Sequence, residues 1–447
     1  MRKLLKNAAV LGLGFLLGLH LALDRQGAAQ AGPGDSGGLP IDEIRTFTEV
    51  FAKIKSDYVE EVGDKALLEN AIRGMLANLD PHSAYLDSEA YMGLQEGTSG
   101  EFGGLGIEVG MEDGFVRVIA PIDDTPAAKA GIMAGDLIIR LDDTAVKGLI
   151  LSDAVKLMRG KPGTSIRLTL VRQGRDRPFE VVVQRAIVKV QSVKSKSLEP
   201  GFGYIRLSHF QVRTGDDLTA AIGTLQRENG HKLQGVVLDL RNNPGGILGA
   251  AVAVADAFLS NGLIVTTRGR GKGSELRFNG KSPDLLHGAP MVVLVNGGSA
   301  SASEIVAGAL QDNRRAVIMG SKTFGKGSVQ TILPMNNNAA LKLTTARYYT
   351  PSGRSIQGEG VIPDIVIDKV RLAAIEPSAA DELKEADLTG HLGNGYRPVG
   401  QAKAGKSPNP AAEARKLAKS DYELYEALNL LKGLALQRAS GGRLPVR

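Results

Sequence analysis

A strand that turns abruptly into a helix is the feature that most restricts the fold of this chain. Met291 to Asn296 is an apolar run of strand length, and Asn296-Gly297-Gly298 is typical of a turn. Ser301-Ala-Ser-Glu304 then has the form of a capping box, which predicts that a helix begins at Ser301. Strands and helices alternate around this unit, so the sequence predicts an α/β domain. The predicted elements are strand Val236 to Leu240, helix Ile247 to Leu259, strand Leu263 to Thr267, strand Met291 to Val295, helix Ser301 to Asp312 and strand Ala316 to Met319.

Ser301 would lie at the N-terminus of this helix, a position that suits a nucleophile. Backbone N–H groups in the first helical turn have no partner within the helix, and the helix dipole favours negative charge there. An oxyanion beside Ser301 would therefore be stabilised. A serine followed three residues later by glutamate most often only caps a helix, so a second feature is needed to favour catalysis.

Lys326, which lies between two glycines, is a candidate base for that serine. A serine hydroxyl is a weak nucleophile until a base takes its proton, and none of the six histidines lies in a recognisable triad context. Keeping a lysine neutral near pH 7 costs roughly 4.6 kcal/mol unless burial lowers its pKa. We therefore expect Lys326 to be largely desolvated in the folded protein.

The segment Gly320 to Lys326 also resembles a phosphate-binding loop. It follows a predicted strand and matches all but the last position of Gly-x-x-x-x-Gly-Lys-[Ser/Thr]. Gly327 stands where the hydroxyl ligand of magnesium would be, and the residues after it are typical of a strand rather than a helix. Both departures count against nucleotide binding.

A third motif, Asp239-Leu-Arg-Asn-Asn-Pro-Gly-Gly246, precedes the motifs around the serine and the lysine. Together with Gly298-Ser-Ala-Ser-Ala-Ser-Glu304 and Thr323-Phe-Gly-Lys-Gly-Ser-Val-Gln330, it resembles the C-terminal processing peptidases, also called tail-specific proteases. The resemblance implies a serine endopeptidase with a crotonase-like ββα core. It implies no metal and no cofactor.

The resemblance also implies roles for individual residues. Ser301 falls on the nucleophile, Lys326 on the base, and Gln330 on the glutamine that positions the lysine. The family's 25-residue step from nucleophile to base selects Ser301 over Ser299 and Ser303, a choice that the residues alone leave open. Lys326 and Gln330 would stand about 13 Å apart on a strand but about 6 Å apart across a helical turn, so direct contact requires the turn.

The same resemblance implies an oxyanion hole made of two backbone N–H groups. One comes from Ala302, and the other comes from Gly245 or Gly246 of the Asn-Pro-Gly-Gly turn. Glycine suits this position because the lack of a Cβ atom lets the backbone approach the reacting carbonyl. Without the resemblance, the segment would be interpreted only as a turn between a strand and a helix.

Residues 97–185 resemble a PDZ domain. Gly103-Gly-Leu-Gly-Ile107 matches its carboxylate-binding loop, and Pro126 to Ile138 matches its central helix and turn. Backbone N–H groups of such a loop bind a chain-end carboxylate, and strand Ile107 to Val109 can accept a peptide as an added strand. The alternative is a glycine-rich hairpin without a ligand. The predicted peptide-binding residues, whose apolar members favour a hydrophobic last residue, are Gly104, Leu105, Gly106, Ile107, Val155 and Met158.

The basic charge of the chain is concentrated at its two ends. Residues 1–31 contribute +3 and residues 401–447 contribute +5, so residues 32–400 carry 6 − 3 − 5 = −2 of the net +6. This distribution does not favour a nucleic-acid-binding face. The chain has no cysteine, which excludes disulfides, thiol catalysis and a lipid-modified cysteine.

Residues 1–31 have the pattern of an export signal. Basic residues precede an apolar stretch from Ala8 to Leu23, and Ala29-Gln-Ala31 matches a cleavage site. The alternative is an uncleaved anchor, but the 16-residue stretch is shorter than the ~20 residues that a spanning helix needs. We therefore predict an exported protein, periplasmic or otherwise outside the cytoplasm, and associated with the inner membrane if the signal is retained.

Helical patterns are predicted near both ends of the exported chain. Residues 32–96 form a linker and a helical region whose apolar stripe, from Ile44 to Ile54, is expected to build a core. Residues 186–370 form the protease core. Residues 371–447 contain a flexible linker and a helix whose stripe, from Tyr422 to Leu434, either contacts another subunit or packs on its own core.

The sequence thus predicts an exported serine endopeptidase that binds apolar C-terminal tails on a PDZ domain and cleaves through a Ser301 acyl-enzyme. Its predicted partners are envelope proteins with such tails, an adaptor protein and further copies of the chain. The alternative is a PDZ peptide-binding module whose hydrolase site is silent.

Overall fold

The computed structural model describes residues 40–122, 124–368, 370, 385, 389–392 and 410–440. The predicted export signal, residues 1–31, lies outside the described residues, as does most of the predicted flexible linker. The chain divides into two units, residues 1–75 and 76–447. Among the described helices, none has both the length and the apolar character that crossing a membrane requires.

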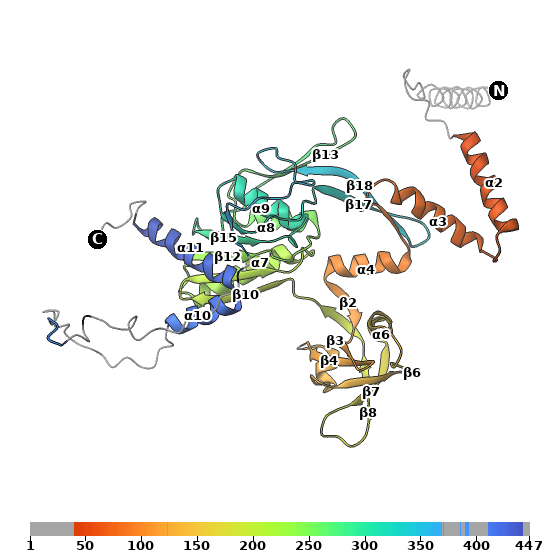
Figure 1. Ribbon diagram of the computed structural model, residues 1–447, viewed down its shortest axis with the longest axis horizontal. Helices are drawn as coiled ribbons and strands as arrows, with labels where there is room; N and C mark the ends of the chain where they lie inside the picture. The colour runs from red at the N-terminus through yellow and green to blue at the C-terminus, as the bar shows by residue number, and fades with distance from the viewer. Residues whose placement is uncertain are drawn as a thin grey trace, which may run out of the picture. The chain divides into compact units, whose positions relative to one another are not determined.

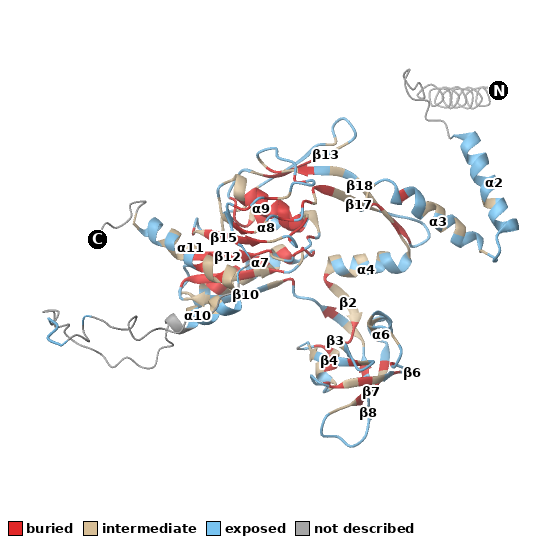
Figure 2. Cartoon of the chain, in the orientation of Figure 1, coloured by how far each residue is buried: buried red, intermediate tan, exposed pale blue. Residues whose placement is uncertain are grey.

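The first unit contains α2 (Ile41–Asp57) and most of α3 (Asp64–Ala77). The helices are present as predicted, but no residue of α2 is buried (Figure 2). Phe47 and Val50, in the middle of the apolar stripe, are 46% and 53% exposed. The prediction that this stripe builds a core within the chain is therefore wrong.

The second unit contains a six-stranded sheet whose strands are mostly parallel (Figure 1). Neighbours from β11 to β19 are parallel, and β10 is an antiparallel edge strand. Every residue of β12 and β15 is buried, which explains why these strands are continuous apolar runs in the sequence. In spatial order the strands are β10 (Val193–Glu199), β11 (Phe202–Leu207), β12 (Gly235–Asp239), β15 (Met291–Val295), β16 (Val317–Gly320) and β19 (Ile365–Val366).

Helices cover both faces of this sheet. Side chains alternate along a strand, so Val236 and Leu238 pack with the cluster that contains α7, α8 and α9, whereas Val237 packs with Leu428 and Leu431 of α11. The stripe from Tyr422 to Leu434 was expected either to contact another subunit or to pack on its own core. The structure shows that it packs on its own core. The helices are α7 (Thr214–Glu228), α8 (Leu248–Asp256), α9 (Ala302–Asp312) and α11 (Tyr422–Ala439), the last preceded by α10 (Pro410–Ser420).

A second, antiparallel sheet carries the residues that follow Lys326. β17 and β18 form a hairpin, and β18 also pairs with β1 and β13. Through β1, the predicted N-terminal helical region, residues 32–96, is joined to this sheet. The strands are β1 (Ala84–Leu86), β13 (Leu263–Gly269), β14 (Leu276–Asn279), β17 (Ser328–Pro334) and β18 (Ala340–Tyr349).

Residues 105–184 form a third sheet with its own hydrophobic core. Its strand order, β3-β4-β5-β7-β8, leaves β3 at one edge. A two-stranded ribbon, β2 (Glu101–Gly104) with β9 (Ala186–Lys189), connects it to the preceding α4 (Ser88–Ser99) and to the six-stranded sheet. The elements are β3 (Ile107–Glu112), β4 (Phe115–Pro121), α5 (Pro126–Lys129), β5 (Leu137–Leu141), β6 (Thr144–Ala145), α6 (Leu151–Met158), β7 (Ser165–Val171) and β8 (Phe179–Gln184).

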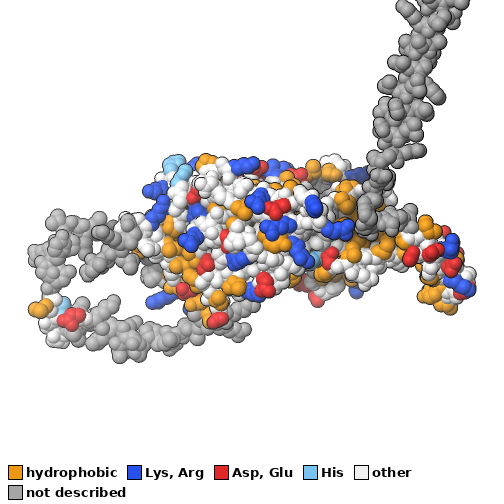
Figure 3. Space-filling model, turned by 90° about the horizontal axis from the view of Figure 1, so that it is seen from above, with side chains coloured by type: hydrophobic (Ala, Val, Ile, Leu, Met, Phe, Trp, Pro, Cys, Tyr) orange, Lys and Arg blue, Asp and Glu red, His pale blue; other side chains and the backbone are white. Residues whose placement is uncertain are grey.

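Charged side chains of both signs are interspersed on the visible surface. Figure 3 shows acidic, basic and apolar groups mixed on one face, without an extended patch of a single sign.

Candidate active site

Ser301 lies at the junction of β15 and α9, where the sequence predicts it. It is the N-cap of α9 and has φ 55°, a region that residues other than glycine rarely adopt. Non-glycine residues in such conformations persist only where the surrounding structure holds them, and they are concentrated at functional sites. The strained backbone of Ser301 therefore supports a functional role for this residue.

Glu304 is the residue that holds this junction. Its side chain is fully buried, and one oxygen, Oε2, accepts hydrogen bonds from the Ser301 N–H at 2.7 Å and the Lys326 N–H at 2.8 Å. The other oxygen, Oε1, accepts from the Gly325 N–H at 2.7 Å and the Thr323 hydroxyl at 2.6 Å. Four donors compensate for burying a carboxylate. The capping-box pattern predicts the bond to Ser301, but it gives no sign of the three bonds to the lysine loop.

The Ser301 hydroxyl forms a hydrogen bond with Tyr348. The two oxygens are 2.5 Å apart, and Tyr348, on β18, is only 3% exposed. Burial raises the pKa of Tyr348 far above its usual value, so the phenol stays protonated at neutral pH. Tyr348 could not be identified from the sequence, because nothing in the local pattern of β18 distinguishes it from an ordinary core aromatic residue.

Lys326 lies on the loop before β17 and is half-buried. Burial lowers its pKa, and the positive charge of Lys342 lowers the pKa further, while Asp80 and Glu304 act in the opposite sense. The direction of the shift is the one that a general base requires, although the desolvation is less complete than the sequence analysis expects. In the part of the chain that the structure describes, no hydrogen bond joins the Lys326 ammonium to Ser301.

Gln330 does not contact Lys326 through a hydrogen bond in the structure. Its Nε2 donates to the Ser328 hydroxyl at 3.0 Å and to the Thr344 hydroxyl at 3.3 Å. Thr344 in turn donates to Asp80 at 3.1 Å. The reason is the backbone, since Gln330 lies on the extended strand β17 rather than on the turn that direct contact requires.

The Asn-Pro-Gly-Gly turn approaches Ser301 closely, as the implied oxyanion hole requires. A Cβ atom at Gly245 would lie 2.9 Å from Ser301 Cβ and 3.0 Å from the Ala302 nitrogen, so only glycine fits. The Gly245 N–H already donates to Asn243 Oδ1 at 2.9 Å. The N–H groups of Ala302 and Gly246 donate to no other described residue. Of the three candidates, these two are therefore available to an oxyanion.

The predicted peptide-binding residues divide into two groups. Leu105 and Met158 are 2% and 5% exposed and belong to the core of the third sheet, so their predicted role as pocket walls is not supported. Ile107 and Val155 are partly exposed. Gly104 is buried in β2, and Gly106 has φ 77°, which glycine adopts without strain. Because β3 is an edge strand, its outer side can pair with an added peptide strand.

Within the described residues, no group of three or more histidine, aspartate or glutamate side chains is arranged to hold a metal ion. Ser301 supplies a hydroxyl, the loop that Glu304 ties to it carries an amine of lowered pKa, and the Ala302 and Gly246 N–H groups have no acceptor among the described residues. Such a set can form and stabilise a tetrahedral intermediate of acyl transfer.

Comparison with known protein families gives three matches along the chain. Residues 201–367 match the description "Peptidase family S41", residues 103–183 match "PDZ domain", and residues 22–90 match "Activating protease CtpB N-terminal domain". The S41 match contains all three motifs discussed above.

Individual proteins are similar over most of their length. A carboxy-terminal-processing protease of Bartonella bacilliformis is 49% identical over 392 residues, which cover 88% of each chain. The carboxy-terminal processing protease CtpA of Bacillus subtilis is 33% identical over 365 residues, 81% of this chain and 76% of the relative. Among solved structures, a photosystem II D1 C-terminal processing protease is 34% identical, with a TM-score of 0.43 over 72% of this chain and 86% of that one.

Proposed function

The chain belongs to peptidase family S41, as a carboxy-terminal processing serine peptidase with a PDZ domain, and we propose that it cleaves peptide bonds through Ser301 and Lys326. The family and the α/β fold predicted from the motifs are thereby confirmed. The roles of individual residues are our proposal. The observation that supports them most is the Glu304 carboxylate, which accepts hydrogen bonds from the N–H groups of both Ser301 and Lys326.

In the first half of the reaction, Ser301 Oγ attacks the carbonyl carbon of the scissile peptide bond. Its proton passes to the neutral amine of Lys326, and the carbonyl oxygen becomes an oxyanion that accepts hydrogen bonds from the Ala302 and Gly246 N–H groups. The intermediate collapses when the C–N bond breaks. The Lys326 ammonium then gives its proton to the leaving amine, which departs with the C-terminal fragment of the substrate.

In the second half, water hydrolyses the ester between Ser301 and the N-terminal fragment. Lys326, neutral again, takes a proton from the water as it attacks, and returns that proton to Ser301 Oγ when the C–O bond breaks. The products are a peptide carboxylate and the original enzyme. Before each cycle the Ser301 hydroxyl must exchange its bond to Tyr348 for one to Lys326. Hydrogen bonds of this kind are often absent without substrate and form only in the complex.

The experiment that tests the proposal compares degradation of labelled casein by the wild type, Ser301→Ala and Lys326→Ala. Both variants should lose activity while they keep the wild-type circular dichroism spectrum. Ser299→Ala is the matched control, although its hydroxyl donates to the Leu240 carbonyl and a modest loss of stability is expected. If all the proteins degrade casein alike, the proposed dyad is wrong.

The rival proposal is a peptide-binding module whose hydrolase site is silent. The observation that favours it is the Ser301 hydroxyl, which is bonded to Tyr348 rather than to a base. Wild-type protein that binds tailed peptides but neither cleaves them nor reacts with a fluorophosphonate would support this rival.

We further propose that apolar C-terminal tails bind along β3. The free edge of the sheet would pair with the peptide backbone, and Ile107 and Val155 would contact the last side chain. Deleting residues 97–185 should then slow turnover of tailed substrates while the protease core stays folded. Equal rates on tailed and untailed substrates, before and after the deletion, would contradict this role.

The location and partners of the protein are also proposals. The pattern of residues 1–31 supports export to the periplasm or beyond, where substrates would be envelope proteins and an adaptor would deliver them. The exposed stripe on α2 supports association with further copies of the chain. Sequencing the N-terminus of protein recovered from the periplasmic fraction tests the first point, and light scattering of the purified protein tests the second.

A further inference from the structure

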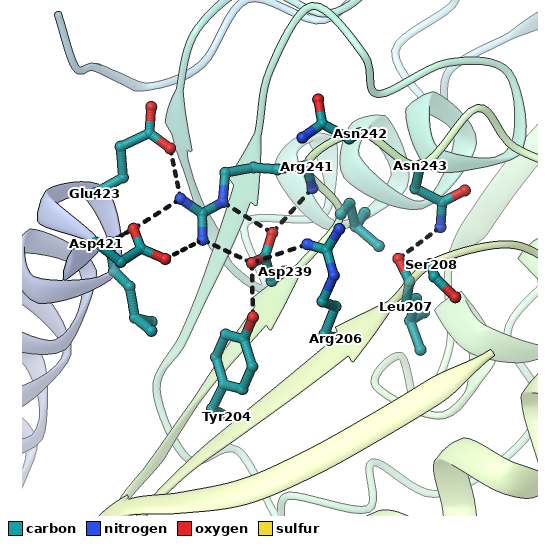
Figure 4. Close-up of polar contacts among 12 residues, drawn as sticks. Tyr204, Arg206, Leu207, Ser208, Asp239, Arg241, Asn242, Asn243, Asp421 and Glu423 are labelled. Atoms are coloured by element: carbon teal, nitrogen blue, oxygen red, sulfur yellow. Dashed lines mark hydrogen bonds and ion pairs between the residues drawn. The ribbon is translucent and has the colours of Figure 1, made fainter. Parts of the chain in front are cut away.

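Two arginines converge on one buried carboxylate at the end of β12. Asp239 is fully buried, and its Oδ2 accepts hydrogen bonds from the Tyr204 hydroxyl at 2.8 Å and Arg241 at 2.7 Å and lies 3.2 Å from Arg206 (Figure 4). On the side of the six-stranded sheet, the charges of this cluster are therefore +2 from the arginines, +1 from Lys196, whose ammonium lies 5.3 Å from the centre of the Tyr204 ring, and −1 from Asp239. A sheet with these residues alone would carry an uncompensated positive charge in a site largely shielded from water.

The N-terminus of α11 supplies the missing negative charge. Asp421 and Glu423 both accept hydrogen bonds from Arg241, at distances of 2.7 to 2.9 Å. With Asp239, they use all five N–H donors of the guanidinium, whose side chain is only 13% exposed. With Lys196 counted, the balance changes from +2 to +3 − 3 = 0. Figure 4 shows Arg241 extending from the strand end towards these two carboxylates of α11.

Arg241 is also the residue that begins the turn beside Ser301. The next residue, Asn242, has φ 55° and donates its N–H to Asn296 Oδ1 at 2.9 Å. Asn243 accepts hydrogen bonds on its carbonyl from the Ala300 N–H at 3.0 Å and the Ser303 hydroxyl at 2.8 Å. The first half of the turn is thus fixed both to the N-terminus of α9 and, through Arg241, to α11. The second half is fixed by Phe210, whose N–H donates to the Gly245 carbonyl at 2.9 Å and whose carbonyl accepts from the Ile247 N–H at 2.9 Å.

We propose that α11 is a positioning element of the active site, in which Asp421 and Glu423 hold Arg241 and thereby place the Gly246 N–H for the oxyanion. This inference rests on the proposed function and deepens it. The helix lies outside residues 201–367, the range of the S41 match, so nothing in that match assigns it a role. Arg241, Asp421 and Glu423 act through the turn and do not touch the substrate.

The test is a double variant, Asp421→Asn with Glu423→Gln, in the full-length protein. Asp421 caps α11 by accepting from the Leu424 N–H at 3.0 Å, and asparagine caps helices about as well, so the helix itself should persist. Removing one oxyanion donor lowers kcat by about 10²–10³, so a displaced donor should lower it roughly ten- to a hundredfold. KM for labelled casein should stay within about twofold, because only the transition state uses this donor.

A second readout separates positioning from general damage. A peptide boronate forms a tetrahedral adduct with the serine, so its inhibition constant should rise by the same factor as kcat falls. The matched control is Glu413→Gln with Glu426→Gln, which removes the same charge from α10 and α11 without touching Arg241. The control should keep wild-type kcat and boronate affinity.

The proposal is overturned if a folded double variant keeps wild-type kcat and boronate affinity. It is also overturned if active-site titration shows that kcat falls only because a smaller fraction of the molecules has a reactive Ser301. If the double variant folds poorly, Glu423→Gln alone is measured in the same way, since it leaves the cap intact. Failure of the proposed function looks different. In that case the wild type itself would be no more active than Ser301→Ala.

Discussion

Glu304 shows how a single buried charge can organise a catalytic site. Its two oxygens receive four hydrogen bonds, from both sides of the candidate dyad. We expect Glu304→Gln to destabilise the protein by about 2–3 kcal/mol, because the amide NH₂ would face N–H donors and hydrogen bonds to a charged acceptor are lost. Urea unfolding measures this change, and kcat should fall at least about tenfold as the lysine loop shifts. Glu43→Gln, at an exposed position on α2, is the control.

Tyr348 holds the Ser301 hydroxyl in an arrangement that competes with the proposed dyad. Replacing it by phenylalanine removes a hydrogen bond of about 1 kcal/mol net. If this bond stabilises only the resting arrangement, Tyr348→Phe should label with a fluorophosphonate up to about fivefold faster than the wild type. Slower labelling of a folded Tyr348→Phe variant would mean that the phenol takes part in the chemistry.

The pKa of Lys326 predicts how activity depends on pH. The neutral amine is the active form, so kcat/KM should rise with pH through the pKa of Lys326, which burial and then Lys342 lower below the ordinary value of 10.5. Removing the neighbouring positive charge with Lys342→Gln should raise that pKa and move the profile to higher pH. Lys322→Gln, at an exposed position on the same loop as Lys326, should leave the profile unchanged. A shift to lower pH in Lys342→Gln would contradict this assignment.

At the scale of elements, the free edge of β3 leads to a prediction about binding. Val155 on α6 is partly exposed, and burying an apolar side chain against it is worth about 1.5–3 kcal/mol. Val155→Lys should therefore weaken binding of a peptide with a C-terminal leucine by about tenfold or more, measured by fluorescence polarisation. Val182→Lys, at a 64% exposed position on β8, is the control. Equal affinities of the wild type and Val155→Lys for this peptide would show that Val155 does not contact it.

Some strands and helices of the protease core, such as β15 and α9, could be predicted because each has a strong local signal, whereas α7 and β18 were not predicted. β15 runs from Met291 to Val295 as predicted, and α9 begins one residue after the predicted N-terminus. The contacts of the elements could not be predicted in the same way. The stripe on α2 has helical spacing, yet it is exposed, because periodicity identifies a helix but not what packs against it.

At the scale of the whole molecule, the candidate site draws on segments that are far apart in the sequence. The motifs at 239–246, 298–304 and 323–330 were recognisable, but Thr344 and the acidic N-terminus of α11 were not. These groups reach the site through pairing of β1 with β18 and docking of α11 on β12. Such long-range contacts leave no local pattern, so only the folded structure could show that an arginine of the third motif is held by a C-terminal helix.

The central claim is that Lys326 activates Ser301, and the most direct measurement is the rate of fluorophosphonate labelling in the wild type and in Lys326→Ala. Loss of the general base should slow labelling by about 10²–10⁴ at pH 8, with Ser301 as the only labelled serine. The control Lys322→Ala should label at the wild-type rate. Equal rates in the wild type and in folded Lys326→Ala, or a label on another serine, would contradict the account.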